Sequence, residues 1–257
     1  MKRSTAIVLQ LWLPVLIVAL WWVLTIGSTS LFFPPLSEIV AHFGHWWLGE
    51  GFVRDFVPSL RNLALGYTLA VVLGIGGGLV IGSLPRLREA IAPELEYARA
   101  IPAVALLPAA VIILGLGDLM RVSLIAVGAV WPVLLATIAG VRETMARLGD
   151  VETSFRLPLH VRALVRVQGA LPRILAGART SIAIAVVLIV VSEMQGGAYG
   201  IGNRLLNSQR NYAISEMWSA MLLLGLLGYT VNSLFLLAER RLLRSYPESQ
   251  NTRKVKS

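Results

Sequence analysis

The sequence predicts an all-α, polytopic membrane protein with about six transmembrane helices, and its composition carries this prediction. Of the 257 residues, 56% are hydrophobic and only 14% are charged, whereas about 25% are charged in an ordinary globular domain. The mean hydropathy of +0.72 is too high for a disordered chain. The chain has no cysteine, which excludes a small secreted scaffold built on disulfide bonds.

Charge-free runs long enough to cross a bilayer place the helices in order. About 20 apolar residues in a helix span the ~30 Å hydrocarbon core. The first run is longer than the apolar region of a signal peptide, so we expect it to remain as a span. The third run is interrupted by Pro102 and Pro108, and the fifth is short. A single transmembrane domain is predicted, with spans at about residues 6–27, 60–84, 98–117, 120–141, 173–194 and 215–238.

Lysine and arginine residues orient these spans. If the N-terminus lies inside, the four inside segments hold 2, 3, 7 and 6 basic residues, or 18 of the 23. Basic residues favour the cytoplasmic side of a membrane protein, so both termini are predicted to be cytoplasmic. The net charge of +9 is then explained by orientation, and no nucleic-acid partner is expected.

The basic segment between the fourth and fifth spans is the most informative stretch. Residues 142–179 contain seven arginines with apolar residues between them, and the segment is too long for a simple turn. It predicts a docking surface for a cytoplasmic partner. The alternative is a basic loop that faces lipid and follows only the positive-inside rule.

Two further patterns have structural interpretations. Gly74, Gly78 and Gly82 recur every four residues in the second span, which predicts a seam of close helix packing whose partner helix stays open. His42 and His45 lie three apart, as half of a metal site would. No metal is expected, because no third ligand follows, and the pair is interpreted as an interfacial anchor.

Several motifs together resemble a known family. They are Arg99-Ala100-Ile101-Pro102, Glu152-Thr153-Ser154-Phe155-Arg156-Leu157-Pro158, Ile174-Leu175-Ala176-Gly177-Ala178-Arg179 and Ser192-Glu193-Met194. In this order and spacing the chain resembles the permease subunits of bacterial ABC importers. Within them it is similar to the branch for nitrate, sulfonate, taurine and bicarbonate, with a type I importer permease fold.

This resemblance implies a transport subunit and not an enzyme. Two copies of the permease would form the path for a small anionic solute through the bacterial inner membrane. Two cytoplasmic ATPase subunits and an extracytoplasmic binding protein would be the other partners. The chain lacks a G-x-x-x-x-G-K-[ST] phosphate loop, so ATP and magnesium would be bound by the ATPase, and this chain is expected to bind no cofactor of its own.

The resemblance also implies a coupling segment, at 142–172. Thr153–Leu157 is predicted to form a short helix, with Asp150 as its N-cap and Pro158 as its stop. Phe155 is expected to be its anchor on the ATPase. The alternative is docking through residues 161–167. The expected coupling residues are Glu152, Ser154, Phe155, Arg156, Leu157, Pro158, Arg162 and Arg166.

The gate of the pathway is expected near the outer end of the fifth span. A carboxylate near the membrane is costly unless it is hydrated or paired, so we expect Glu193 to shape an outer gate by pairing with an arginine or with backbone donors. The alternative is an exposed interfacial acid. The expected pathway residues are Pro102, Ser192, Glu193, Met194 and Gln195.

Two other functional classes compete with this interpretation. A secondary transporter usually carries ionisable residues within its spans, but here charges stay near the span ends. A membrane enzyme would need paired acids or a histidine cluster, and three scattered histidines do not form one.

Overall fold

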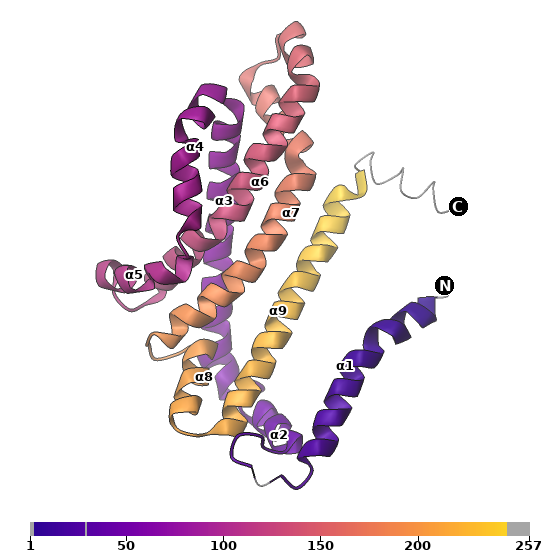
Figure 1. Cartoon of the computed structure of the whole chain (residues 1–257), viewed down its shortest axis with the longest axis vertical. Coiled ribbons are helices and arrows are strands. Elements are labelled where there is room, and N and C mark those ends of the chain that lie inside the picture. Colours follow the sequence, from indigo (N-terminus) through magenta and orange to yellow (C-terminus); the bar gives the residue numbers. More distant parts are fainter. Residues whose placement is uncertain (1–2, 29, 246–257) are drawn as a thin grey trace. The chain divides into compact units, whose positions relative to one another are not determined.

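The computed structural model describes residues 3–28 and 30–245, with side chains from Trp12 onward except those of residues 14, 151–153 and 245. The regular secondary structure of the described residues is all helical (Figure 1), which confirms the predicted all-α class. It divides into two compact units, Met1–Pro58 with Ala198–Gly225 (unit 1) and Ser59–Gly197 with Leu226–Ser257 (unit 2). The main helices are α1 (Arg3–Thr25), α2 (Leu36–Trp47), α3 (Val57–Ser83), α4 (Pro85–Ala100), α5 (Leu107–Leu114), α6 (Asp118–Ser154), α7 (Leu159–Met194), α8 (Ile201–Arg210) and α9 (Ile214–Leu242).

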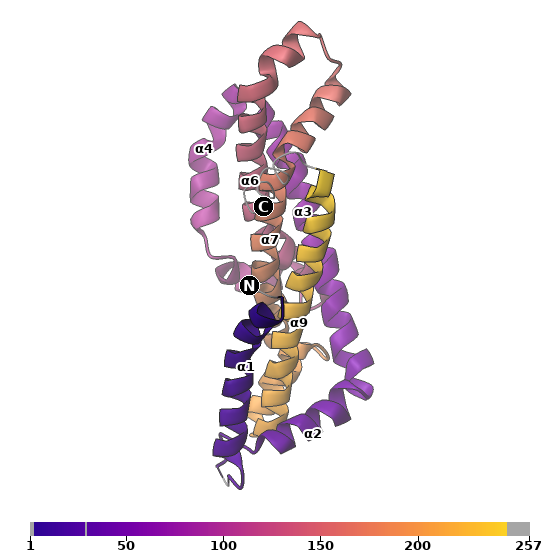
Figure 2. The same cartoon turned by 90° about the vertical axis from the view of Figure 1, so that its right-hand side faces the viewer.

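Unit 2 is built around a long hairpin of α6 and α7, which lie side by side in both views (Figures 1 and 2). Small residues allow the two helices to approach closely. A Cβ at Gly140 would lie 2.7 Å from the Cβ of Ala170, and one at Gly177 would lie 2.5 Å from the carbonyl oxygen of Pro132. The buried Ser181 hydroxyl donates across the pair to a backbone carbonyl of α6. Glycine positions therefore fix where the two helices touch.

The glycine seam of α3 packs against α6. A Cβ at Gly74 would lie 2.8 Å from the Cβ of Val133, and one at Gly78 would lie 2.4 Å from that of Thr137. Gly82 faces Val141 in the same way. All three glycines are buried. The structure thus identifies the partner of the seam as α6 within the same chain.

The predicted third span is not one helix, which corrects the sequence prediction for 98–117. The chain breaks after Ala100, where Ile101 is extended (φ −73°, ψ 118°) before Pro102, because proline disfavours the helical conformation of the residue that precedes it. A short 3₁₀ turn, Ala103–Leu106, leads into α5, and Gly115 ends α5 with a φ of +73°. The helices on the two sides of the break are bent by 82°.

The bend bears on the number of candidate spans in the described part of the chain. Within the described residues, four helical stretches are long and apolar enough to cross a membrane, or five if the bent pair counts as one. The apolar stretch of α1 with described side chains is shorter, Val15–Thr25. Residues 85–99, predicted only as an inside segment, form most of helix α4.

The predicted coupling loop 142–172 is almost entirely helical, which is a second correction. Helix α6 continues through Asp150 to Ser154, and α7 begins at Leu159. There is no separate helix capped by Asp150, and the predicted stop at Pro158 instead precedes the first residue of α7. The segment has no proline before the tip, so α6 continues to a four-residue turn that leads into α7.

Unit 1 combines α1, α2, α8, the start of α9 and a π-helical turn, Phe52–Phe56. Asp55 is buried and accepts hydrogen bonds from the Gly200 backbone N–H (3.1 Å) and from the Trp46 indole (3.2 Å). The indole of Trp47 donates to the Ser219 hydroxyl (3.2 Å). These bonds tie segments far apart in sequence into one unit.

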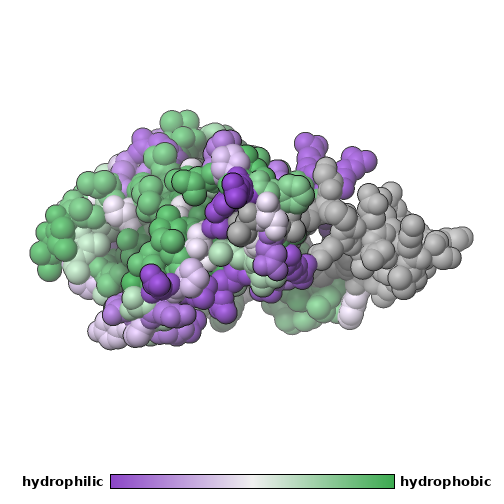
Figure 3. Space-filling view, turned by 90° about the horizontal axis from the view of Figure 1, so that it is seen from above, coloured by the Kyte–Doolittle hydropathy of each residue, from purple (hydrophilic) through white to green (hydrophobic). Residues whose placement is uncertain are grey.

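The surface is that of a membrane protein. Large apolar side chains are exposed on several helices, among them Leu24 (71%), Val72 (61%) and Ile112 (84%). The face seen from above shows hydrophobic residues and hydrophilic patches next to each other (Figure 3). Exposed apolar patches of this extent mark contact with lipid or with other proteins.

Candidate functional site

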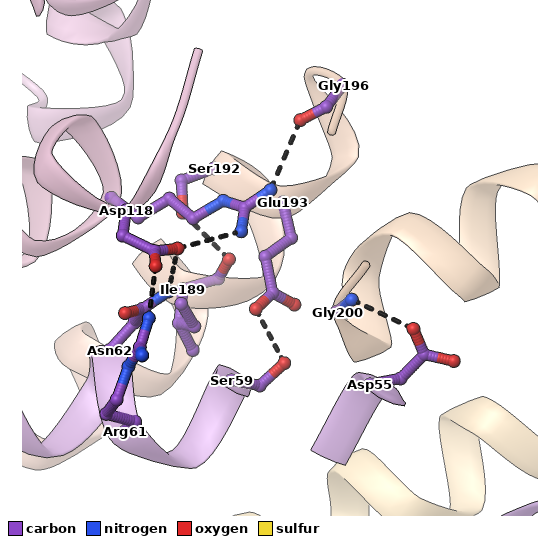
Figure 4. A network of polar contacts seen from close by, with 11 residues as sticks. Asp55, Ser59, Arg61, Asn62, Asp118, Ile189, Ser192, Glu193, Gly196 and Gly200 are labelled. Atoms are coloured by element: carbon purple, nitrogen blue, oxygen red, sulfur yellow. Dashed lines mark hydrogen bonds and ion pairs between the residues drawn. The ribbon is translucent and has the colours of Figure 1, made fainter. Parts of the chain in front are cut away.

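The first candidate site lies at the end of α7, where Glu193 is held by α3. The Ser59 hydroxyl donates to Oε1 of Glu193 over 2.6 Å (Figure 4). Both side chains are only 1% exposed. Burial of a carboxylate is costly without hydrogen bonds or a nearby charge, so this contact fixes the end of α7 against the start of α3.

A second part of the same site surrounds Asp118, the first residue of α6. Asn62 donates to Oδ1 of Asp118 (2.8 Å), and Arg61 forms an ion pair with its other oxygen. The Arg121 guanidinium lies 3.4 Å from Oδ1 of Asp118 and donates to the Gly196 carbonyl, also over 3.4 Å. The network therefore connects α3, α6 and the turn that follows α7 (Figure 4).

The glycine turn after α7 is shaped by Arg121. Gly197 has a φ of +137°, which L side chains rarely adopt, and a Cβ there would lie 2.2 Å from Nη2 of Arg121. Only glycine fits beside the guanidinium without displacing it. Arg121 is 1% exposed. A buried charge and the sharp turn after α7 therefore lie at the same place.

The predicted pathway residues do not all meet here. Ser192 is buried next to Glu193, but its hydroxyl donates to the Ile189 carbonyl of its own helix (2.9 Å). Met194 is partly buried and Gln195 is exposed. Pro102 is exposed in the bend before α5 and takes no part in the network drawn in Figure 4.

Burial contradicts the alternative of an exposed interfacial acid at position 193. A serine hydroxyl contacts Glu193, and Arg204 pairs with Glu216 over 2.6 Å. Sequence reasoning missed Ser59, Asn62 and Asp118 as members of the site. Their signal was weak: polar residues near the ends of apolar runs are common, and nothing in the sequence pairs them.

The second candidate site is the tip between α6 and α7. Phe155 is 75% exposed and Leu159 is 82% exposed. Arg156 adopts a φ of +49° in the turn between them. Large exposed apolar groups on a tight turn are typical of an interface anchor. Sequence reasoning selected Phe155 but not Leu159.

The other predicted coupling residues lie on or near the tip. Ser154, Arg156 and Pro158 are exposed, and Leu157 is partly buried. Arg162 and Arg166 are partly buried in the first turns of α7, so they do not form a fully exposed surface. Glu152 lies on the last turn of α6, and its side chain is outside those that the structure describes.

The chemistry available at the polar network is structural. It contains two arginines and two acids, so the charges balance within the site. All four residues lie near the ends of helices. In the described part of the chain, no group of three or more His, Asp or Glu residues could hold a metal ion. The arrangement is suited to holding three helix ends together or releasing them as a unit.

The chain is similar to several known proteins. The family model described as "binding-protein-dependent transport system inner membrane component" matches residues 70–246. A putative aliphatic sulfonates transport permease protein of Bacillus subtilis is 29% identical over 90% of this chain and 85% of its own length. A bicarbonate transport system permease protein of Synechocystis is 30% identical over 70% of this chain and 65% of its own length. The taurine transport system permease protein of Escherichia coli is 26% identical, with 93% and 89% covered.

Proposed function

The chain belongs to the family of binding-protein-dependent transport system inner membrane components, and from this we propose that it forms the path for a small oxyanion or related organic acid in an ABC importer. Family membership makes it a transport permease and not an enzyme. The observation that carries the solute class is the similarity to permeases named for sulfonates, bicarbonate and taurine. These solutes share a small anionic group.

The proposal includes three partners. A second copy of the permease completes the pathway, two cytoplasmic ATPase subunits supply the energy, and an extracytoplasmic binding protein delivers the solute. The family description, which names a binding-protein-dependent system, supports the last of these. The lack of a phosphate-binding loop in this sequence supports placing ATP and magnesium on the ATPase.

The proposed orientation places both termini and the α6–α7 tip in the cytoplasm. The 18 basic residues on that side, against five on the other, support this orientation. Residues 246–257 of the basic tail lie outside the described residues, so only their sequence contributes. The polar network at the end of α7 then lies at the outer side of the membrane.

Coupling is proposed at the α6–α7 tip. ATP-driven closure of the two ATPases would move the tips, and the rigid hairpin would carry this motion to the rest of unit 2, as a two-state element biased from one end. The exposure of Phe155 and Leu159 supports docking through the tip in preference to residues 161–167. The close packing of α6 on α7 supports the hairpin as the rigid lever.

Reconstitution tests the function directly. We expect purified permease, combined with its ATPase and binding protein in proteoliposomes, to accumulate one labelled solute among an aliphatic sulfonate, taurine, nitrate and bicarbonate. Accumulation should require both ATP and the binding protein. Uptake driven by an ion gradient without the ATPase would contradict the proposal and favour a secondary transporter.

The polar site is proposed to be a latch of the outer gate, to which Glu193 contributes through its hydrogen bond with Ser59. Glu193→Gln keeps the shape of the side chain but removes the charge, and hydrogen bonds to charged groups contribute about 1.5–3 kcal/mol. We therefore expect uptake to fall by about tenfold or more, while ATP hydrolysis becomes less dependent on the solute. Solute uptake and ATPase activity in the same proteoliposomes measure both effects.

Glu50→Gln is the matched control for this substitution. Glu50 is an exposed acid that contacts Arg54 over 3.6 Å in unit 1, so its neutralisation should leave uptake unchanged. If Glu193→Gln also retains wild-type uptake and coupling, the network is not a gate.

A further inference from the structure

The turn between α8 and α9 presents one exposed aromatic side chain on a fixed backbone. Tyr212 is 68% exposed and has a φ of +57°. Its backbone N–H donates to the Gln209 carbonyl (3.2 Å), and that of Ala213 donates to the Ser208 carbonyl (2.9 Å). These bonds fix the backbone that carries the exposed ring, and tyrosines are enriched at protein interfaces.

Two hollows of unit 1 meet at Tyr212. One has a volume of about 400 Å³ and is lined by Glu38, His42, Ser215 and Glu216 among others. The other has a volume of about 430 Å³ and includes Arg210. Tyr212 and Ile214 line both. The tyrosine therefore lies between two concave surfaces.

The first hollow is lined by two acids, Glu38 and Glu216. None of its described lining residues is lysine or arginine. Glu216 is already paired with Arg204 over 2.6 Å. Glu38 accepts a hydrogen bond from the Ser215 hydroxyl (3.1 Å) and makes no ion pair with any residue in the described part of the chain. Its carboxylate is exposed, so a cation from outside can reach it.

We infer that this surface, Tyr212 with the acidic hollow, is where the extracytoplasmic binding protein docks, and that the hollow receives a lysine or arginine side chain of that protein. The inference rests on the proposed function, which places the segments around α2 and the α8–α9 turn outside. Charge complementarity selects the basic side chain, since the exposed Glu38, which has no ion-pair partner among the described residues, attracts a cation. The exposed tyrosine supplies the apolar contact beside the ion pair.

The test is the stimulation of ATP hydrolysis by the binding protein in proteoliposomes that contain the complete complex. We expect Glu38→Lys and Tyr212→Ala each to raise the binding-protein concentration for half-maximal stimulation by about tenfold or more. The maximum at saturating binding protein should be retained, whereas a misfolded permease would lose it. Tyr212→Phe should restore the wild-type concentration, and Glu38→Gln should weaken the dependence of stimulation on salt.

Two controls share the chemistry but not the surface. Glu50→Lys reverses an exposed acid of the same unit, and Tyr97→Ala removes a tyrosine that is 74% exposed on α4. Both should keep the wild-type half-stimulating concentration. If Glu38→Lys and Tyr212→Ala keep it as well, the docking surface is wrong. If Tyr212→Ala instead converts purified permease dimers to monomers, the surface belongs to a contact between copies, which also overturns the inference. Lack of any stimulation in the unaltered complex would count against the proposed function itself.

Discussion

Replacing Gly78 with leucine should prevent α3 from packing on α6 and remove most of the assembled permease from the membrane. A Cβ at this position would lie 2.4 Å from the Cβ of Thr137 and 3.0 Å from the Leu134 backbone carbonyl. The backbone atom cannot move aside as a flexible side chain would. Overpacking a tight contact costs about 1–3 kcal/mol, and more where backbone must move, so we expect a loss of about 3 kcal/mol or more. Thermal unfolding of the purified protein in detergent measures it.

Gly76 provides a matched control on the same helix. A Cβ added at Gly76 would have no atom within 4 Å, and the residue is exposed. Gly76→Leu should therefore leave abundance and unfolding temperature unchanged or slightly raised, because leucine favours helix more than glycine does. Equal tolerance of the two leucines would contradict close packing of α3 on α6.

Replacing Phe155 with alanine should separate the permease from its ATPase. The side chain is 75% exposed on the α6–α7 tip, so it supports no part of the described fold, and its loss should leave permease abundance unchanged. Truncating an interface anchor costs about 2 kcal/mol or more, which corresponds to roughly 30-fold weaker binding. Co-purification of the ATPase and solute uptake should both fall. Leu159→Ala should have a similar but smaller effect.

Docking through residues 161–167 would give the opposite pattern of effects, and the structure argues against it. Arg162→Ala combined with Arg166→Ala should have less effect than Phe155→Ala, because both arginines are partly buried. Phe52→Ala, which removes an exposed ring from unit 1, serves as a control and should leave the complex intact. If the complex survives Phe155→Ala but dissociates in the double arginine variant, docking occurs through residues 161–167.

Much of the fold was predictable because hydropathy is a local property. Each apolar run reports its own preference for the bilayer, so the helical class and the long apolar helices α3, α6, α7 and α9 follow from the sequence. The family also follows from motifs, since the matched region, residues 70–246, contains most of them. Glu193 was selected for a similar reason, because an acid at the end of an apolar run is unusual.

The geometry of the chain at Pro102 could not be predicted from the local sequence. Prolines at positions 102 and 108 are compatible with either a kinked continuous helix or a chain that turns back. The extended backbone at Ile101 and the 82° bend between the flanking helices show that the helix is broken here and not merely kinked. The opposite error occurred at the tip, where a proline at position 158 suggested a separate short helix and two long helices continued instead.

Composition, spacing and motifs by themselves determined that this chain is a helical membrane permease, and they marked Glu193 and Phe155 as candidate functional residues. Only the tertiary structure decided which of them meet. Ser59 and Glu193 are 134 positions apart, and Asn62 and Asp118 are 56 apart. Gly78 contacts Thr137, which is likewise far from it in the chain. A single sequence records the chemistry of each residue but not its long-range partner, because that partner is set by how whole helices pack and not by any interaction between neighbours in the chain.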